Sequence, residues 1–295
     1  MIFSNLKVAV TGGNGFIGSV LISNLKNDYD ITSISRQVLN GEEVCDIDCF
    51  IHLAGLAHTE NAGLKDYIES DLILADCVSS MCIELGIKRF IYISTVQVLG
   101  LATSETEFLT PFSEEKPSTV QAQAKLMVEK KLESSFRGTQ TELVIIRAPL
   151  VYGEGVKANF ASLMKLVGKG FPLPFRAIKQ NKRSLVSVYN LVDLIKVCID
   201  HPKAANQVFL VSDDDDMSTA RMVALMAKAQ GKANLSLPVP VWCFKLAGKL
   251  FKKEAVVDRL VGSLQLDIDH TKNTLDWAPP YSVEYGFALA AKKKD

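Results

Sequence analysis

The sequence Thr11-Gly12-Gly13-Asn14-Gly15-Phe16-Ile17-Gly18 stands near the start of the chain and decides the fold. A β-favouring run over 6–11 precedes it, and apolar residues at helical spacing over 16–26 follow it. Glycine at 12 permits a tight turn, glycine at 15 lets backbone N–H groups approach a pyrophosphate, and glycine at 18 lets the helix pack closely on the strand. This context predicts a dinucleotide-binding turn formed by Gly12, Asn14, Gly15, Phe16, Ile17 and Gly18.

The strand, turn and helix pattern recurs along the first half of the chain. Apolar runs predict strands over 6–11, 31–35, 49–54, 89–95, 143–148 and 208–212, and helical spacing predicts helices over 16–26, 64–85 and 120–136. Strands that are apolar throughout are buried on both faces, which is typical of parallel sheets covered by helices. The fold class is therefore α/β, with a Rossmann-type, doubly wound parallel sheet.

After residue 150 the pattern loosens into helices over 159–167, 191–199, 219–229 and 241–250. We expect residues 1–150 to form an NAD(P)-binding Rossmann domain, to which the segment at 184–212 returns. Residues 151–183 and 213–295 are expected to form a smaller, mostly helical C-terminal lobe that binds the substrate. In a doubly wound sheet this lobe would close over the carboxyl ends of the strands.

Charge and hydropathy limit the partners. Lys and Arg together number 33, as do Asp and Glu, so the formal net charge is zero. The chain has no overall positive field to attract nucleic acid or an anionic membrane, and either partner would need a local patch. The lysines at 292–294 are interpreted as a solvated helix end. No apolar run reaches the roughly 18 residues that span a bilayer, so we expect neither nucleic acid nor a membrane as partner.

The cysteines and acidic residues do not indicate a metal site. Six cysteines lie in the chain without CxxC spacing, which favours reduced core residues. The acidic run at 213–216 is interpreted as a loop leading into a helix capped near Ser218, where negative charge suits the helix dipole. The N-terminus lacks a succession of basic, apolar and small residues, so a cytoplasmic protein is expected.

Coenzyme specificity is read at the end of the second strand, where this chain has Ser35-Arg36. An acid there accepts from the ribose 2′-OH of NAD, whereas an arginine meets the 2′-phosphate of NADP. The nearest acids, Asp28 and Asp30, precede the strand. Arg36 therefore favours NADP over NAD, and the alternative is a surface residue or one that stacks on the adenine.

Motifs along almost the whole chain resemble the extended short-chain dehydrogenase/reductases, in particular the NAD(P)-dependent epimerase/dehydratase family acting on nucleotide sugars. The matching segments are the glycine turn, Ile51-His52-Leu53-Ala54-Gly55, Tyr92-Ile93-Ser94-Thr95 through Gly100, Lys125 with Glu129, Arg147-Ala148-Pro149-Leu150-Val151-Tyr152-Gly153, the stretch 181–188, Gly262-Ser263-Leu264 and Leu275-Asp276-Trp277-Ala278-Pro279-Pro280, in which Asp276 replaces a glycine. The resemblance implies NAD or NADP as cofactor and a nucleotide-sugar substrate, a UDP-hexose in the nearest pattern.

The resemblance also assigns roles to individual residues. Thr95 would hydrogen-bond the C4 oxygen of the sugar, and Lys125 would hold the coenzyme ribose. Arg183 would clamp the sugar-nucleotide diphosphate, for which the arginine fork is well suited. The coenzyme would also pass beside Leu53, Ala54 and Pro149.

The departure from the family lies at the reaction centre. The family carries YxxxK, in which the tyrosine exchanges a proton and the lysine lowers its pKa, but here Gln121 stands four residues before Lys125. Glutamine has no proton to exchange near neutral pH. The chain is then a natural, weakened relative, or carries a deliberate replacement, or uses another group such as Tyr152. A shifted register would instead make Gln121 a surface residue. The segment between Arg36 and Asp48 is also shorter than in the family.

Two segments narrow the reaction. Val96-Gln97 follows Thr95 where sugar 4,6-dehydratases have Asp-Glu, which argues against dehydration. The segment 159–174 resembles UDP-hexose 4-epimerases and related 4-keto-sugar reductases, and its Asn159 is expected to contact the nucleotide or sugar, or else to cap a helix. We therefore expect hydride transfer at C4 of a UDP-hexose. The alternative, favoured by Gln121, is an NAD(P)-binding sensor or scaffold. A homodimer through helices 64–85 and 120–136 is expected by resemblance.

Overall fold

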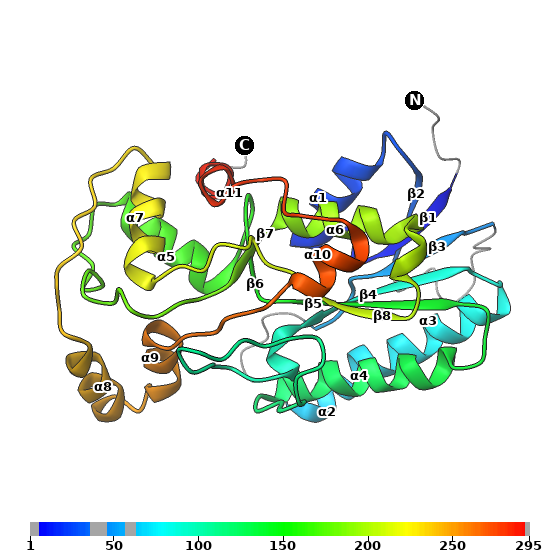
Figure 1. Cartoon of the computed structure of the whole chain (residues 1–295), viewed down its shortest axis with the longest axis horizontal. Helices are drawn as coiled ribbons and strands as arrows, with labels where there is room; N and C mark the ends of the chain where they lie inside the picture. Colours follow the sequence, from blue (N-terminus) through cyan, green and yellow to red (C-terminus); the bar gives the residue numbers. More distant parts are fainter. Residues whose placement is uncertain (1–5, 36–45, 57–62, 293–295) are drawn as a thin grey trace.

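The computed structural model describes residues 6–35, 46–56 and 63–292. Its centre is a sheet of six parallel strands in the order β2-β1-β3-β4-β5-β8 (Figure 1). The predicted α/β class and the parallel sheet are confirmed. The strands are β1 (Lys7–Thr11), β2 (Asp30–Ile34), β3 (Cys49–His52), β4 (Arg89–Thr95), β5 (Glu142–Ala148) and β8 (Gln207–Leu210).

The strand order reverses between β1 and β3, because the chain runs from β1 outward to β2 and then returns to the other side of β1. Thr11 at the end of β1 lies opposite His52 at the end of β3, and Thr11 Oγ1 is 2.7 Å from His52 Nδ1. Ligands of doubly wound sheets bind at such a switch point. The glycine turn that follows Thr11 therefore lies where a ligand is expected.

Helices cover both faces of the sheet, which is why its inner strands are mainly apolar, whereas the edge strand β2 is partly polar and exposed. On one face α3 (Ile73–Glu84) and α4 (Val120–Phe136) pack side by side against β3, β4 and β5. On the other face α1 (Phe16–Leu25) and α6 (Val188–Asp200) pack against β1, β3, β4 and β5. Short 3-10 turns lie at η3 (Val96–Val98) and η4 (Pro202–Ala204).

The predicted helix over 64–85 is interrupted in the structure. It consists of α2 (Leu64–Tyr67), a π-helical turn η2 (Ile68–Leu72) and α3. Sequence periodicity missed the interruption because one extra residue in a turn hardly changes an apolar pattern over 22 positions. The turn carries Asp71, whose side chain is buried. The other helices predicted along the chain are found within a few residues of their expected ends.

The second lobe has its own apolar core, to which α5 (Ala158–Gly168), α7 (Thr219–Ala229) and α11 (Val283–Ala290) contribute. A two-stranded parallel sheet of β6 (Leu150–Tyr152) and β7 (Leu185–Ser187) joins it to the main sheet. Also present are α8 (Val241–Leu250), α9 (Glu254–Val261) and α10 (Asp269–Leu275). Residues 207–210 return to the main sheet as β8, which pairs with β5. The domain boundaries at 150 and 183 stay a prediction.

Five elements of this lobe were not predicted. Strands β6 and β7 have three residues each, and α9, α10 and α11 have seven or eight, so their periodic signals are short.

Within the described ranges, every helix is too short or too polar to traverse a lipid bilayer.

The acidic run at 213–216 is a loop before α7, as predicted, and Ser218 caps that helix by accepting from the backbone N–H of Arg221 at 3.1 Å. Its carboxylates do more than complement a helix dipole, because each binds a different segment. Their partners are Tyr152, Ser187 and Asn190 for Asp213; Lys272 for Asp214; Arg221 for Asp215; and Ser184 and Gln265 for Asp216. The run therefore fastens the second lobe to the end of the main sheet.

A buried ion pair fixes α4 on β5. Arg147 donates from Nη2 to Glu129 Oε2 at 2.6 Å, and its Nε lies 3.2 Å from both oxygens of the same carboxylate. Both side chains are buried. Glu129 lies one helical turn after Lys125, so the pair also fixes where that lysine stands.

We predict that Glu129→Ala lowers the free energy of unfolding by about 3 kcal/mol, because it leaves the buried Arg147 guanidinium with only the partly exposed carboxylate of Glu115, 3.3 Å away. The measurement is urea-induced unfolding. Glu133→Ala, which removes the partly exposed partner of Lys130 on the same helix, should cost at most about 1 kcal/mol. Equal losses in the two variants would contradict this account of the Arg147–Glu129 pair.

Candidate functional site

The glycine turn is held together by close backbone approaches. Gly12 has a φ of +73° and accepts a hydrogen bond from the N–H of Gly15 at 2.9 Å. A Cβ on Gly12 would stand 2.9 Å from the backbone N of Ala54 and 3.0 Å from the carbonyl carbon of Leu53. A Cβ on Gly18 would stand 2.2 Å from Gly12 O. The structure therefore brings the end of β3, with Leu53 and Ala54, directly against the turn.

The first turn of α1 opens from this loop without a side-chain cap. Gly15 occupies the N-cap position, and the first turn carries no acidic residue. The N–H of Gly15 is bound to the Gly12 carbonyl, but the N–H groups of the first turn of α1, from Phe16 onward, have no acceptor within the helix and are available to an anion. The helix dipole also favours negative charge at this end. Phe16 approaches the family-like segment from Arg147 to Gly153, since a Cβ on Gly153 would lie 3.7 Å from Phe16 Cζ. These residues fit the pyrophosphate of a dinucleotide.

Thr95 ends β4 at the same edge of the sheet. It pairs in register with Ala148 of β5, so Pro149, the next residue, lies at this edge as well. The Thr95 hydroxyl accepts from the backbone N–H of Gln97 at 3.3 Å. The side chain is half-buried, and its oxygen retains hydrogen-bonding capacity for a further group.

Gln121 and Lys125 come from the start of α4, where the Thr119 side chain caps the helix by accepting from Ala122 N at 3.1 Å. They stand one turn apart on the same face of the helix, and Gln121 is half-buried. Gln121 has no hydrogen-bond partner among the residues that the structure describes. That it replaces a catalytic tyrosine stays a prediction.

Lys125 reaches back under the end of β4. Its Nζ donates to the Ile93 carbonyl at 3.4 Å and lies 4.9 Å from the centre of the Tyr92 ring. Desolvation lowers the pKa of Lys125, and the negative charges of Asp71 and then Glu129 oppose that shift. Since Glu129 is bound to Arg147, Asp71 is the acid free to balance the ammonium.

Asp71 was not singled out by the sequence analysis. Its Oδ1 accepts from the backbone N–H of Leu56 at 2.7 Å. A Cβ on Gly55 would lie 3.1 Å from Asp71 Oδ2 and 3.3 Å from Lys125 Nζ, so the two charged groups face each other across Gly55. A signal existed in the sequence, because Asp71 continues the spacing of the apolar stripe formed by Ala75, Val78 and Cys82. A buried carboxylate on such a stripe is stable only with a cation or hydrogen-bond donor beside it, so its position predicts a partner.

Two tyrosines near this region do not fit the role of a substitute proton carrier. Tyr152 is fully buried, and its hydroxyl donates to Asp213 Oδ2 at 2.7 Å. Burial, with the Asp213 charge, raises its pKa far above the usual value. Burial likewise raises the pKa of Tyr92, whose hydroxyl has no hydrogen-bond partner within the described ranges. The suggestion that Tyr152 replaces the missing tyrosine is therefore disfavoured by its surroundings.

Arg183 lies at the junction of the second lobe with β7. Its Nη1 donates to the Gly262 carbonyl at 3.3 Å, and in the part of the chain that the structure describes it has no carboxylate partner. Desolvation, and after it the positive charge of Arg259, lowers its pKa. Two guanidinium groups whose charges repel each other, with no ion pair to an acid among the described residues, favour an anion. Arg259, on α9, was not identified from the sequence.

The predictions for Asn159 and Arg36 have different outcomes. Asn159 is the second residue of α5, and Lys157 occupies the N-cap without a side-chain cap, so the interpretation of Asn159 as a cap is wrong. Its side chain is exposed, and its contact with a nucleotide or sugar stays a prediction. Arg36 lies outside the described residues.

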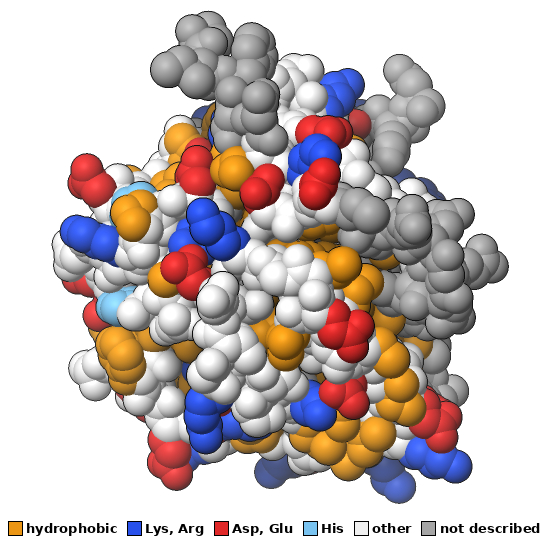
Figure 2. All heavy atoms as spheres, turned by 90° about the vertical axis from the view of Figure 1, so that its right-hand side faces the viewer, with side chains coloured by type: hydrophobic (Ala, Val, Ile, Leu, Met, Phe, Trp, Pro, Cys, Tyr) orange, Lys and Arg blue, Asp and Glu red, His pale blue; other side chains and the backbone are white. Residues whose placement is uncertain are grey.

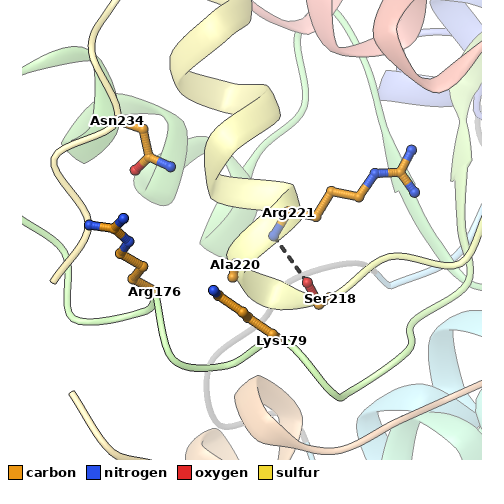
Figure 3. A pocket seen from close by; sticks show the side chains of 6 residues that line it. All are labelled: Arg176, Lys179, Ser218, Ala220, Arg221 and Asn234. Carbon is orange, nitrogen blue, oxygen red and sulfur yellow. Dashed lines mark hydrogen bonds between the residues drawn. The ribbon is translucent and has the colours of Figure 1, made fainter. Parts of the chain in front are cut away.

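A cavity of about 390 Å³ lies in the second lobe beside the start of α7 (Figure 3). In Figure 3 the Arg221 side chain points away from it, toward its ion pair with Asp215. Arg176 and Lys179 have no ion pair with any described residue. The cavity is close to Arg183, because Ser218 in its wall follows Met217, and Met217 forms an isolated antiparallel β-bridge with Arg183. It is lined by Arg176, Lys179, Ser218, Ala220, Arg221 and Asn234.

We predict that Gly18→Ala lowers the free energy of unfolding by about 3 kcal/mol or more, because the new methyl group would overlap the Gly12 backbone and neither backbone segment can move cheaply. Thermal or urea unfolding measures the loss. Gly63→Ala is the matched control, since its methyl would be 3.7 Å from the nearest atom, Asp66 Oδ2. A Gly18→Ala protein as stable as the control would show that the turn is looser than described.

Comparison with known proteins agrees with this site. Residues 8–212 match the NAD dependent epimerase/dehydratase family. A protein of Vibrio cholerae named UDP-glucose 4-epimerase is 46% identical over an alignment of 312 positions. The alignment covers 97% of this chain and 94% of that protein.

Solved structures share the fold. A UDP-glucuronic acid 4-epimerase from Bacillus cereus in complex with NAD has a TM-score of 0.77 at 18% identity, covering 96% of this chain and 97% of that one. RMD from Pseudomonas aeruginosa, complexed with NADPH, has a TM-score of 0.79 at 16% identity, covering 97% and 98%. Both of these solved structures hold a nicotinamide dinucleotide. By the match over 8–212, this chain belongs to the NAD dependent epimerase/dehydratase family.

Proposed function

We propose that this protein is a nucleotide-sugar 4-epimerase or 4-keto reductase that acts at C4 of a UDP-hexose. The observation that carries the proposal is the 46% identity, over nearly the full length of both chains, with the protein named UDP-glucose 4-epimerase. The geometry supports it, because groups suited to a coenzyme, a sugar oxygen and a diphosphate belong to the carboxyl edge of the sheet and to the lobe joined to that edge.

The nicotinamide coenzyme supplies the hydride chemistry when bound. The chain's own part is to bind, orient and polarise. We propose that the amides at the start of α1 hold the pyrophosphate, that Lys125 holds the ribose, and that Thr95 hydrogen-bonds the C4 oxygen. Arg183 and Arg259 would hold the diphosphate of the sugar nucleotide, with the adjoining cationic cavity on the nucleotide side.

Asp71 deepens this proposal, because it maintains the charge on Lys125. We predict that Asp71→Asn lets the pKa of Lys125 fall further. The protonated ammonium is the donor to the ribose, so coenzyme affinity should decline at a lower pH than in the parent as the pH rises. Loss of this charged donor should weaken binding about tenfold or more.

The measurement is NADH and NADPH binding by fluorescence from neutral to alkaline pH. Asp76→Asn is the control, because Asp76 is an exposed acid on the adjoining α3, paired with Lys131 at 2.8 Å. Superimposable pH profiles for Asp71→Asn and the parent would contradict the proposed role of Asp71.

Gln121 favours a second candidate, a catalytically weakened family member that binds NAD(P) as a sensor or scaffold. A positioned acid–base group typically contributes about 10²–10⁴-fold to the rate, so its absence could leave binding intact while turnover fails. Neither Tyr92 nor Tyr152 is placed or ionised to compensate.

We predict that Gln121→Tyr raises turnover of a UDP-hexose by about 10²–10⁴-fold, because the new hydroxyl would stand one turn before Lys125 on the same face of α4. Gln123→Tyr, at an exposed position of that helix, should give no gain. If only Gln121→Tyr turns over the UDP-hexose, the native chain binds coenzyme without catalysing the reaction. If the parent turns it over equally fast, another residue carries the proton. No turnover by any of the three proteins with NAD or NADP would contradict the proposed enzyme.

The finer assignments are proposals of the same kind. We propose NADP over NAD from Arg36, a cytoplasmic location, and a homodimer through α3 and α4. Support for the dimer comes from apolar side chains that these helices expose, among them Ile73, Ile83 and Met127.

A further inference from the structure

Helix α8 exposes an apolar strip. Trp242, Leu246 and Leu250 follow one another at intervals of four, which places them along one side of the helix. Their exposed fractions are 66%, 61% and 75%, and Phe251, the next residue, is 69% exposed. Three large apolar side chains in one strip, with a fourth at the C-cap that follows, are more than the scattered exposed residues that a soluble surface normally carries.

The opposite side of α8 holds the helix on the protein. The Phe244 ring stacks on Phe175 with centroids 5.9 Å apart. Gly248 is buried, and a Cβ there would lie 2.9 Å from Val257 Cγ2 of α9. The helix therefore has a fixed orientation, with the apolar strip directed outward. Figure 1 places α8 at the far end of the second lobe from α1 and β1, so a surface contacting the strip would leave the glycine turn free.

Lysines border the strip. Lys245 and Lys249 lie beside Trp242 and Leu246 on the helix, and Lys252 and Lys253 follow its end. All four are exposed, and none forms an ion pair with a residue in the described ranges. The surface at the other end of the molecule, in Figure 2, instead intersperses acidic and basic side chains. In a chain of zero net charge, α8 is thus a local basic patch joined to an apolar one.

We propose that α8 docks this protein on an anionic lipid surface, with the helix lying in the interface. A helix with Trp and Leu side chains along its exposed side, Phe251 at its end and lysines beside them fits such a surface in two ways. The apolar chains enter the acyl boundary, and the ammonium groups meet acidic headgroups. Trp also prefers the headgroup level. Net charge alone had suggested no membrane partner, and the difference is that this patch is local.

The chain offers a direct spectroscopic test, because it has two tryptophans. Trp242 is 66% exposed and Trp277 is 6% exposed. On addition of phosphatidylglycerol-containing vesicles, the emission should shift to shorter wavelength, and brominated lipids should quench it. Trp242→Phe should lose both signals while the protein still cosediments with the vesicles. Cosedimentation without any change in Trp242 emission would show that another surface binds.

Charge variants test the source of the attraction. The double variant Lys245→Gln, Lys249→Gln should weaken partitioning onto these vesicles roughly 30-fold. Each lysine near an anionic surface raises the partition constant about fivefold, and two lysines are removed. Lys88→Gln with Lys203→Gln, at exposed positions beside the main sheet, is the control and should change nothing. Partitioning onto neutral phosphatidylcholine vesicles as strong as onto anionic ones would overturn the proposal. So would no partitioning, or a concentration-dependent blue shift without vesicles that accompanies self-association in sedimentation.

Discussion

The backbone of Gly12 lies in van der Waals contact with the backbone at Leu53 and Ala54, and Gly18 lies against Gly12 in turn. No side chain fits at either position, so two strands and a helix meet there without any intervening atoms. This contact sets the ends of β1 and β3 level at the point where the strand order reverses. It also directs the uncapped start of α1 toward the carboxyl edge of the sheet. Thr95 and Pro149 follow from strand register, and Lys125 follows from the attachment of α4.

Lys125 shows how buried charges position a functional group. The Arg147–Glu129 pair fixes α4 on β5, and Asp71 faces the ammonium across Gly55. Both acids are buried and both are partnered, which is the condition under which buried charge is tolerated. The arrangement is intact even though Gln121 stands where proton exchange is expected. Under the proposed roles, binding and proton transfer are therefore separable: the described residues include groups suited to coenzyme binding and no evident group for proton exchange.

Sequence reasoning succeeded where a local pattern dictates a structure. The glycine turn, the six strands of the main sheet and α4 have strong periodic or steric signals, and the positions of Thr95, Gln121 and Lys125 follow from them. It failed where tertiary contacts decide. The π-helical turn that buries Asp71 leaves the apolar period almost unchanged, strands β6 and β7 are three residues long, and the partners of the acidic run come from segments far apart in the chain. Asp276 shows a substitution the backbone explains: it has a φ of +48°, where glycine is favoured and Asp is tolerated.

The central claim is that backbone amides beside three glycines hold the diphosphate bridge of a pyridine coenzyme. Isothermal titration calorimetry of the unmodified chain with NAD, NADH, NADP and NADPH tests it most directly. The account predicts saturable binding of at least one of them, with one site per chain. Absence of a binding heat for all four, even at millimolar concentration and at more than one temperature, would contradict it.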